Sequence, residues 1–229
     1  MKMKTLLCAA GIAALAIPAM AQTPVYSLNV VGYVNTTIAN GKYTMFANQL
    51  DIDGTGTNNT ILSVFSTNMP SGSAVYRWNK SIANWDVYNY TVKSGKGAWS
   101  PNGTASVNPG EGVLVKLPGG VDVTNTTVGT VLQGSLTNNY LNASGGYAGV
   151  AMMIPIGGLL QSSLNYIPQS SEAAYKWNQT IANWDVFNYT VKSGKGAWSP
   201  TQPSFNVGEG LLLKTVVGSH WITNFTVGP

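Results

Sequence analysis

The stretch RWNKSIANWDVYNYTVKSGKGAWSP, residues 77–101, is repeated as KWNQTIANWDVFNYTVKSGKGAWSP at residues 176–200. Over the slightly longer segments 74–101 and 173–200, 23 of 28 positions are identical. Two further matches follow in the same order: NPGEGVLVK at 108–116 with NVGEGLLLK at 206–214, and TNTTVG at 124–129 with TNFTVG at 223–228. An ordered series of matches at a spacing of about 99 residues indicates a tandem duplication.

Short β-branched and aromatic runs, separated by Gly, Asn, Ser and Pro, predict strands along the whole mature chain. The expected strands lie at 44–50, 74–78, 85–92, 112–117, 149–156, 209–215 and 220–227. Beyond the N-terminal region, only residues 59–66 and 157–166 allow a short helix. Many short strands with frequent turns are typical of a sandwich or barrel. We therefore predict an all-β fold of two tandem units of about 99 residues, sandwich- or barrel-like and related by a pseudo-twofold axis.

The N-terminal residues 1–21 have the pattern of an export signal. Lys2 and Lys4 precede a short apolar run, and small residues stand at Ala19 and Ala21. We expect cleavage near Ala21, a secreted or cell-surface location and no membrane span in the mature chain. The repeat divides the mature chain into units at 22–124 and 125–229. Because a Val-Gly strand pattern opens each unit and recurs at 225–228, we expect a partial third unit at the C-terminus.

The mature chain is poor in the residues that most enzyme and metal sites use. Without Lys2 and Lys4, ten scattered Lys and Arg stand against eight Asp and Glu, which argues against a nucleic-acid partner. Cys8, the single cysteine, lies in the signal, so no disulfide or cysteine metal ligand remains. His220 is the single histidine, and no nucleophile motif accompanies it. We expect no catalytic residue, no metal site, no cofactor and no enzymatic activity.

The repeated Trp-rich hairpin is the candidate site, and three interpretations remain open. The rings could fill the core of each unit, form an exposed platform for sugar rings with polar partners beside them, or form a protein–protein surface. Two copies on one chain would grip a polymer with higher avidity. The candidate surface residues are Trp78, Asn79, Asn84, Trp85, Asp86, Tyr88, Lys96 and Trp99 in the first copy, and Trp177, Asn178, Asn183, Trp184, Asp185, Phe187, Lys195 and Trp198 in the second.

The pattern of divergence also bears on the hairpin. The preceding segments, 41–73 and 146–172, share little beyond apolar character, while the hairpin is nearly unchanged. A core tolerates apolar substitutions of similar volume, so identity that extends to polar loop residues is more than packing requires. This favours a shared surface role, and a recent copying event would explain it equally well.

The ordered motifs VYSLNVVGYVN, YRWN…W…Y…GAWSP, NPGEGVLVK and WITNFTV resemble an uncharacterised family of secreted all-β tandem-repeat proteins of the Planctomycetes–Verrucomicrobia type. The resemblance covers nearly the whole mature chain. It implies export and an all-β fold, and it implies no activity and no site residues.

Together these features predict a non-catalytic, secreted or cell-surface protein that works as a structural or interaction protein. The terminal strands could pair within the chain, or could pair head to tail between chains and so drive self-assembly. The alternative function is a carbohydrate-binding module that uses the repeated Trp and Tyr hairpins on an extracellular polysaccharide.

Overall fold

The computed structural model describes residues 30–65 and 69–227, so the expected export signal lies outside the described residues. Strands dominate, every strand pair is antiparallel, and the all-β prediction is confirmed. The one α-helix of the described residues is α1 (Ile61–Phe65), within the expected segment 59–66. The other candidate segment, 157–166, holds the two-residue strand β10 (Gly158–Leu159) and turns instead. Within the described ranges, no helix is long and apolar enough to cross a membrane.

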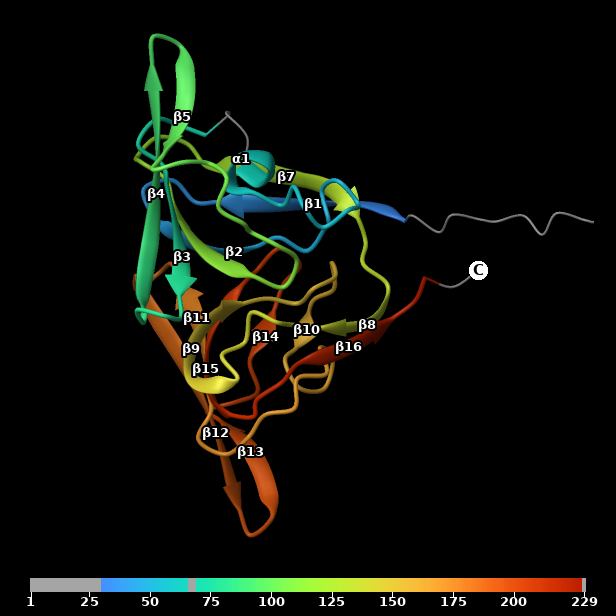
Figure 1. Ribbon diagram of the computed structural model, residues 1–229. Helices are drawn as coiled ribbons and strands as arrows, with labels where there is room; N and C mark the ends of the chain where they lie inside the picture. Colours follow the sequence, from blue (N-terminus) through green and yellow to red (C-terminus); the bar gives the residue numbers. More distant parts are fainter. Residues whose placement is uncertain (1–29, 66–68, 228–229) are drawn as a thin grey trace, which may run out of the picture.

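Two five-stranded sheets with the same strand order form the framework (Figure 1). The first has the order β2-β6-β3-β4-β5: β2 (Tyr43–Ala47), β6 (Gly112–Lys116), β3 (Ala74–Asn79), β4 (Asn84–Lys93) and β5 (Lys96–Ser100). The second has the order β9-β15-β11-β12-β13: β9 (Ser144–Val150), β15 (Leu211–Val217), β11 (Ala173–Asn178), β12 (Asn183–Lys192) and β13 (Lys195–Ser199). The β4–β5 and β12–β13 hairpins project from opposite ends of the molecule (Figure 1).

Each sheet covers a hydrophobic cluster with one face. In the first cluster, Phe46 of β2 packs on Phe65 of α1, with ring centroids 4.8 Å apart. In the second, Tyr166 packs on Trp221 at 5.5 Å. The second cluster also contains Val34 from β1 (Val31–Ile38), so the clusters are not confined to one half of the sequence each. Figure 1 shows α1, β1, β7 (Val123–Thr130), β8 (Gly134–Thr137) and β16 (Ile222–Phe225) on the right-hand side of the two sheets.

The terminal strands pair within the chain. β1 (Val31–Ile38) pairs along its full length with β7 (Val123–Thr130), and β8 (Gly134–Thr137) pairs with β16 (Ile222–Phe225). The Val-Gly segment expected to open the second unit lies in β7 and pairs with β1, and Phe225, from the segment expected to open a third unit, pairs with Gly134 of β8. A last pair joins β10 to β14 (Ser204–Phe205).

The two halves meet at the Gly-Glu-Gly segments, each of which extends the sheet of the other half. Residues 208–210 pair with the free edge of β2 through the Ala47 amide, which donates to the Gly208 carbonyl at 2.9 Å. In the same way, the Ala151 amide beyond β9 donates to the Gly110 carbonyl at 2.9 Å. A Cβ on Gly112 would lie 2.5 Å from the Val150 carbonyl oxygen, so glycine is required where the chains cross.

One expected strand is displaced. The sequence GVAMMIPI predicts a strand over 149–156, whereas β9 spans Ser144–Val150 and residues 151–156 are irregular. These residues include buried Met152 and Ile154. The apolar run indicates that these residues are buried in the second cluster. It does not distinguish a strand from a buried irregular segment, because both have the same apolar composition.

Candidate functional site

Eight aromatic side chains lie on the sheet faces that point away from the two hydrophobic clusters. We call this set the aromatic face: Tyr43, Tyr76, Trp78 and Trp85 from the first sheet, and Tyr147, Tyr175, Trp177 and Trp184 from the second. All eight are half-buried, so part of each ring reaches solvent. The Trp78 and Trp85 rings meet edge to face at 5.1 Å, and so do the Trp177 and Trp184 rings.

The aromatic face is continuous across the two halves. Trp78 packs on Tyr147 of the second half at 5.9 Å, and Trp177 packs on Tyr43 of the first half at 5.6 Å. A Cβ on Gly149 would lie only 3.5 Å from the Trp78 Cβ, which shows how closely the indole sits against the other half. The repeated hairpins therefore also form the contact between the halves. This contact gives a structural reason why both copies keep a tryptophan at this position, Trp78 and Trp177.

Burial and mutual hydrogen bonding change the acidity of the tyrosines in this face. Partial burial raises the pKa of Tyr175 to about 12, and the neighbouring Tyr147 hydroxyl, 3.3 Å away, adds to the effect. Partial burial also raises the pKa of Tyr76, with Tyr43 contributing. The raised pKa values keep the Tyr76 and Tyr175 phenols neutral at physiological pH, so both can donate hydrogen bonds. The indole nitrogens of Trp78 and Trp177 are buried and have no hydrogen-bond partner among the described residues.

The remaining aromatic residues of the hairpins face inward. Trp99 is buried and packs on Tyr90 at 5.0 Å, while Tyr88 also lies in the first cluster. In the second copy, Trp198 and Phe187 are half-buried against the second cluster, and the Trp198 indole donates to Gln161 Oε1 at 3.1 Å.

Near the projecting end of each hairpin, a tyrosine ring leaves no room for a side chain at a glycine of the neighbouring strand. A Cβ on Gly97 would lie 1.6 Å from the Tyr90 hydroxyl oxygen, and one on Gly196 would lie 1.7 Å from that of Tyr189. Each tyrosine ring lies across the glycine on the neighbouring strand, which compensates for the missing side chain. The turns themselves follow the type I′ rule, with positive φ at Ser94 and Gly95.

The polar candidate residues do not gather around the Trp pairs. Asp86 lies on the opposite face of the hairpin from Trp85, and it accepts a hydrogen bond from Asn79 at 3.0 Å. Asp185 and Asn178 repeat this contact at 3.0 Å. Four other candidates lie at the ends of strands: Asn84, Asn183, Lys96 and Lys195.

The strand-end residues have local roles. The Asn84 side-chain oxygen accepts the Trp85 amide at 2.8 Å, and Asn183 does the same for Trp184. Lys96 stands directly opposite Lys93 at the projecting turn, as Lys195 does opposite Lys192. The lysine pairs are exposed and far along the hairpins from the contact between the halves (Figure 1).

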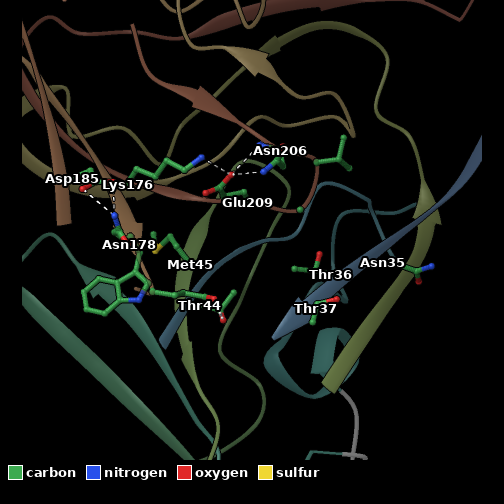
Figure 2. Close-up of a pocket in the computed structure, with 14 residues that line it drawn as sticks. Asn35, Thr36, Thr37, Thr44, Met45, Lys176, Asn178, Asp185, Asn206 and Glu209 are labelled. Carbon is green, nitrogen blue, oxygen red and sulfur yellow. Dashed lines mark hydrogen bonds and ion pairs between the residues drawn. The ribbon is translucent and has the colours of Figure 1, made fainter. Parts of the chain in front are cut away.

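A polar cleft of about 480 Å³ opens between the two halves on the inner side of the hairpins (Figure 2). We call it the inter-unit cleft. Its walls come from β1 and β2 of the first half and from β11, β12 and residues 206–209 of the second. The lining residues are Asn35, Thr36, Thr37, Thr44, Met45, Lys176, Trp177, Asn178, Gln179, Asp185, Asn206, Val207, Gly208 and Glu209.

Charged groups in the cleft are partly paired. Lys176 Nζ donates to Glu209 Oε2 at 3.0 Å, and Glu209 also accepts the Asn206 amide at 2.9 Å. With Asp185, the lining carries two carboxylates and one ammonium. The cleft therefore suits neutral or cationic ligands better than anionic ones.

Other chemistries have little support among the described residues. His220 is exposed and contacts the Gly218 carbonyl. No group of three or more His, Cys, Asp or Glu in residues 30–65 and 69–227 could hold a metal ion. In the loop at 51–57, Asp53 accepts hydrogen bonds from Thr55 and Thr57, which hold the pKa of Asp53 well below its usual range.

Sequence reasoning identified the hairpins but not their neighbours. The tyrosines of β2 and β9 and all cleft residues outside the hairpins were missed. Strand alternation could have placed Tyr43 outward, but its contact with Trp177 depends on how the halves dock. In comparisons with protein-family models, with curated proteins and with solved structures, the chain matches none of them.

Proposed function

We propose that this chain is a non-catalytic, secreted or cell-surface interaction protein whose aromatic face binds extracellular polysaccharide. The observation that carries the proposal is the aromatic face itself, with eight half-buried Tyr and Trp rings continuous over both sheets. The outer face of a solvated antiparallel sheet is normally polar, so a row of aromatic rings there needs a reason.

Polysaccharides fit this surface by their chemistry. A pyranose ring carries apolar C–H groups on its faces and hydroxyls at its rim. Trp and Tyr offer flat, apolar rings, and the tyrosine hydroxyls can hydrogen-bond at the rim. Because Trp85 and Trp184 come from different hairpins, a long polymer can contact both, which raises avidity without a new kind of contact.

Head-to-tail strand exchange has less support than polysaccharide binding. β16 already pairs with β8, and Trp221 beside it is buried in the second cluster. A chain ending at Thr215 would lose both features, so we expect it to unfold. Light scattering of the mature protein still tests self-assembly, and a monodisperse monomer would remove that function.

The polysaccharide proposal is tested with the mature protein, residues 22–229, by affinity electrophoresis in gels that contain soluble xylan, galactomannan or hydroxyethylcellulose, and by pull-down on cellulose and chitin. We expect retention by at least one polymer. Trp85→Ala and Trp184→Ala should each weaken that binding about tenfold, and the double variant should abolish it.

Tyr33→Ala is the matched control, because Tyr33 is a 73 % exposed aromatic residue on β1, away from the aromatic face. It should bind like the unchanged protein. Circular dichroism checks that every variant is folded. Lack of retention by every polymer, or a folded double Trp variant that binds normally, would overturn the proposal.

A further inference from the structure

The inter-unit cleft has a counterpart that one of the chain's own side chains partly occupies, with a smaller pocket of about 240 Å³ left beside it. The counterpart lies beside the first hairpin, where Arg77, Asn108 and Glu111 take the places of Lys176, Asn206 and Glu209. Tyr140 occupies it: the Asn108 side-chain amide donates to the Tyr140 hydroxyl, and both Arg77 and Glu111 act electrostatically on that phenol.

The loop that carries Tyr140 explains the asymmetry. Residues 138–143 join β8 to β9, and Lys80 Nζ fixes the loop by donating to the Leu141 carbonyl at 3.0 Å. The corresponding connection in the first half, 39–42, is shorter and turns away, where Asn40 is held by Asp122 at 2.9 Å. Nothing from the first half therefore reaches the place that Tyr140 would take in the open cleft.

Within the described part of the chain, the polar residues of the open cleft have no ring hydroxyl beside them to bond with. Asn206, the equivalent of Asn108, directs its side-chain amide to the neighbouring Glu209 at 3.3 Å instead of to a ring hydroxyl. Asp185 accepts hydrogen bonds from Asn178, and a carboxylate can accept about four. Figure 2 shows Lys176, Asn178 and Asp185 on one side and Asn206 with Glu209 beyond them.

We propose that the inter-unit cleft binds a pyranose unit of a saccharide, in the place that Tyr140 occupies in the counterpart. The filled cleft shows that a six-membered ring bearing a hydroxyl fits this framework. The lining of the open cleft is about half polar and includes several Asn and Thr side chains, so it matches a ring with several hydroxyls and apolar C–H faces better than a bare phenol. The volume of about 480 Å³ lies in the range of small-ligand pockets.

This inference rests on the proposed function for its ligand class, but it concerns the inter-unit cleft, which shares only Trp177 with the aromatic face. The aromatic face needs a long polymer, whereas the cleft needs only a short saccharide. The two can therefore fail separately.

The experiment titrates the mature protein with methyl glucoside, methyl galactoside, methyl mannoside, N-acetylglucosamine, cellobiose and, separately, N-acetyltyrosinamide. The readout is the NMR shift of the Asn178 and Asn206 side-chain amides. We expect at least one saccharide to shift both signals. Asp185→Ala should weaken that saccharide about tenfold or more, because a carboxylate bonded to hydroxyls is lost.

Asp86→Ala is the matched control, since Asp86 makes the same bonds to Asn79 beside the filled counterpart. It should change stability as Asp185→Ala does and leave saccharide binding unchanged. Equal loss in both variants, no shift with any saccharide, or a response to N-acetyltyrosinamide alone would overturn the inference. Failure here with normal retention by polysaccharide gels would leave the aromatic face as the binding site. The reverse result would retain the cleft and reject the face.

Discussion

The two copies of the Trp hairpin share their sequence but not their surroundings. Beside the first copy, Arg77 pairs with a buried Glu111 and Tyr140 fills the space next to them. Beside the second copy, Lys176 pairs with the more exposed Glu209 and an open cleft remains. The retained residues build the hairpin and the contact between the halves, whereas the divergent connections decide whether the space beside each hairpin is filled.

The largest difference between the halves should appear at their closing strands. Trp221 is 2 % exposed, and its indole donates to the Leu164 carbonyl at 2.7 Å. The equivalent residue in the first half is the exposed Asp122. Trp221→Ala should cost about 3–5 kcal/mol of unfolding free energy in urea, because it leaves a cavity and an unpaired carbonyl. Asp122→Ala should cost far less, and comparable losses would contradict this assignment.

The ion pairs provide the next test. The Glu111 side chain is 4 % exposed and that of Glu209 is 19 % exposed. Removing Arg77 leaves a buried carboxylate without its partner, so Arg77→Ala should lower the free energy of unfolding by roughly 2–4 kcal/mol. The loss should be smaller than for a fully buried pair, because part of the Arg77 side chain is exposed. Lys176→Ala should cost about 1 kcal/mol or less. A larger loss for Lys176→Ala would reverse the comparison.

The loss of stability caused by Arg77→Ala should depend on pH. Burial raises the pKa of Glu111 above its usual value, and Arg77 opposes part of that rise. Stability linked to a raised carboxyl pKa is fully present below the ordinary pKa and is lost as pH rises through the folded-state value. The deficit of Arg77→Ala should therefore be largest at neutral pH. It should shrink as pH falls through the raised pKa of Glu111, and it should be gone below the ordinary glutamate pKa of about 4.3, where the carboxyl is protonated in both the folded and the unfolded chain. Urea melts at several pH values measure it.

The hairpins themselves should behave alike. Gly97→Ala and Gly196→Ala each force a Cβ into a tyrosine ring, and each should cost about 1–3 kcal/mol. Gly95→Ala serves as control, since Gly95 has a positive φ but no neighbour within 4 Å. It should show only the backbone strain of about 1 kcal/mol. A clear inequality between Gly97→Ala and Gly196→Ala would show that the two hairpins are packed differently.

The smallest effect is expected at the projecting turns. Lys96 faces Lys93 in register, and like charges directly opposite each other destabilise a ladder. Lys96→Glu and Lys195→Glu should each stabilise by about 0.2–1 kcal/mol, and added salt should reduce the gain. Thermal melts at low and high salt measure this, and no gain at low salt would show that the lysines avoid each other.

Local patterns in the sequence predicted the class of fold and the repeated hairpins, and they allowed a short helix at two segments, of which only 59–66 contains one. They failed where the answer depended on partners far along the chain. The Val-Gly segment around Val128 has a strand pattern, but its partner, Tyr33 of β1, lies almost 100 residues earlier in the chain. A strand pattern specifies which residues face inward, and it does not specify which other strand will be its neighbour.

The candidate site was only partly predictable for the same reason. Side chains alternate along β4, so Trp85 and Asp86 point to opposite faces of the sheet, and Asp86 does not lie beside the Trp rings. The inter-unit cleft exists because residues 138–143 fill its counterpart and residues 39–42 leave it open. That depends on loop length and docking, which have no periodic signal in the sequence.

The crossing at the Gly-Glu-Gly segments has a consequence for the order of synthesis. The free edge of β2 is covered by residues 208–210, which leave the ribosome more than 150 residues after β2. Until then the nascent first half carries an open strand that other chains could join. Protection of this edge from aggregation therefore has to wait until the second half has been made.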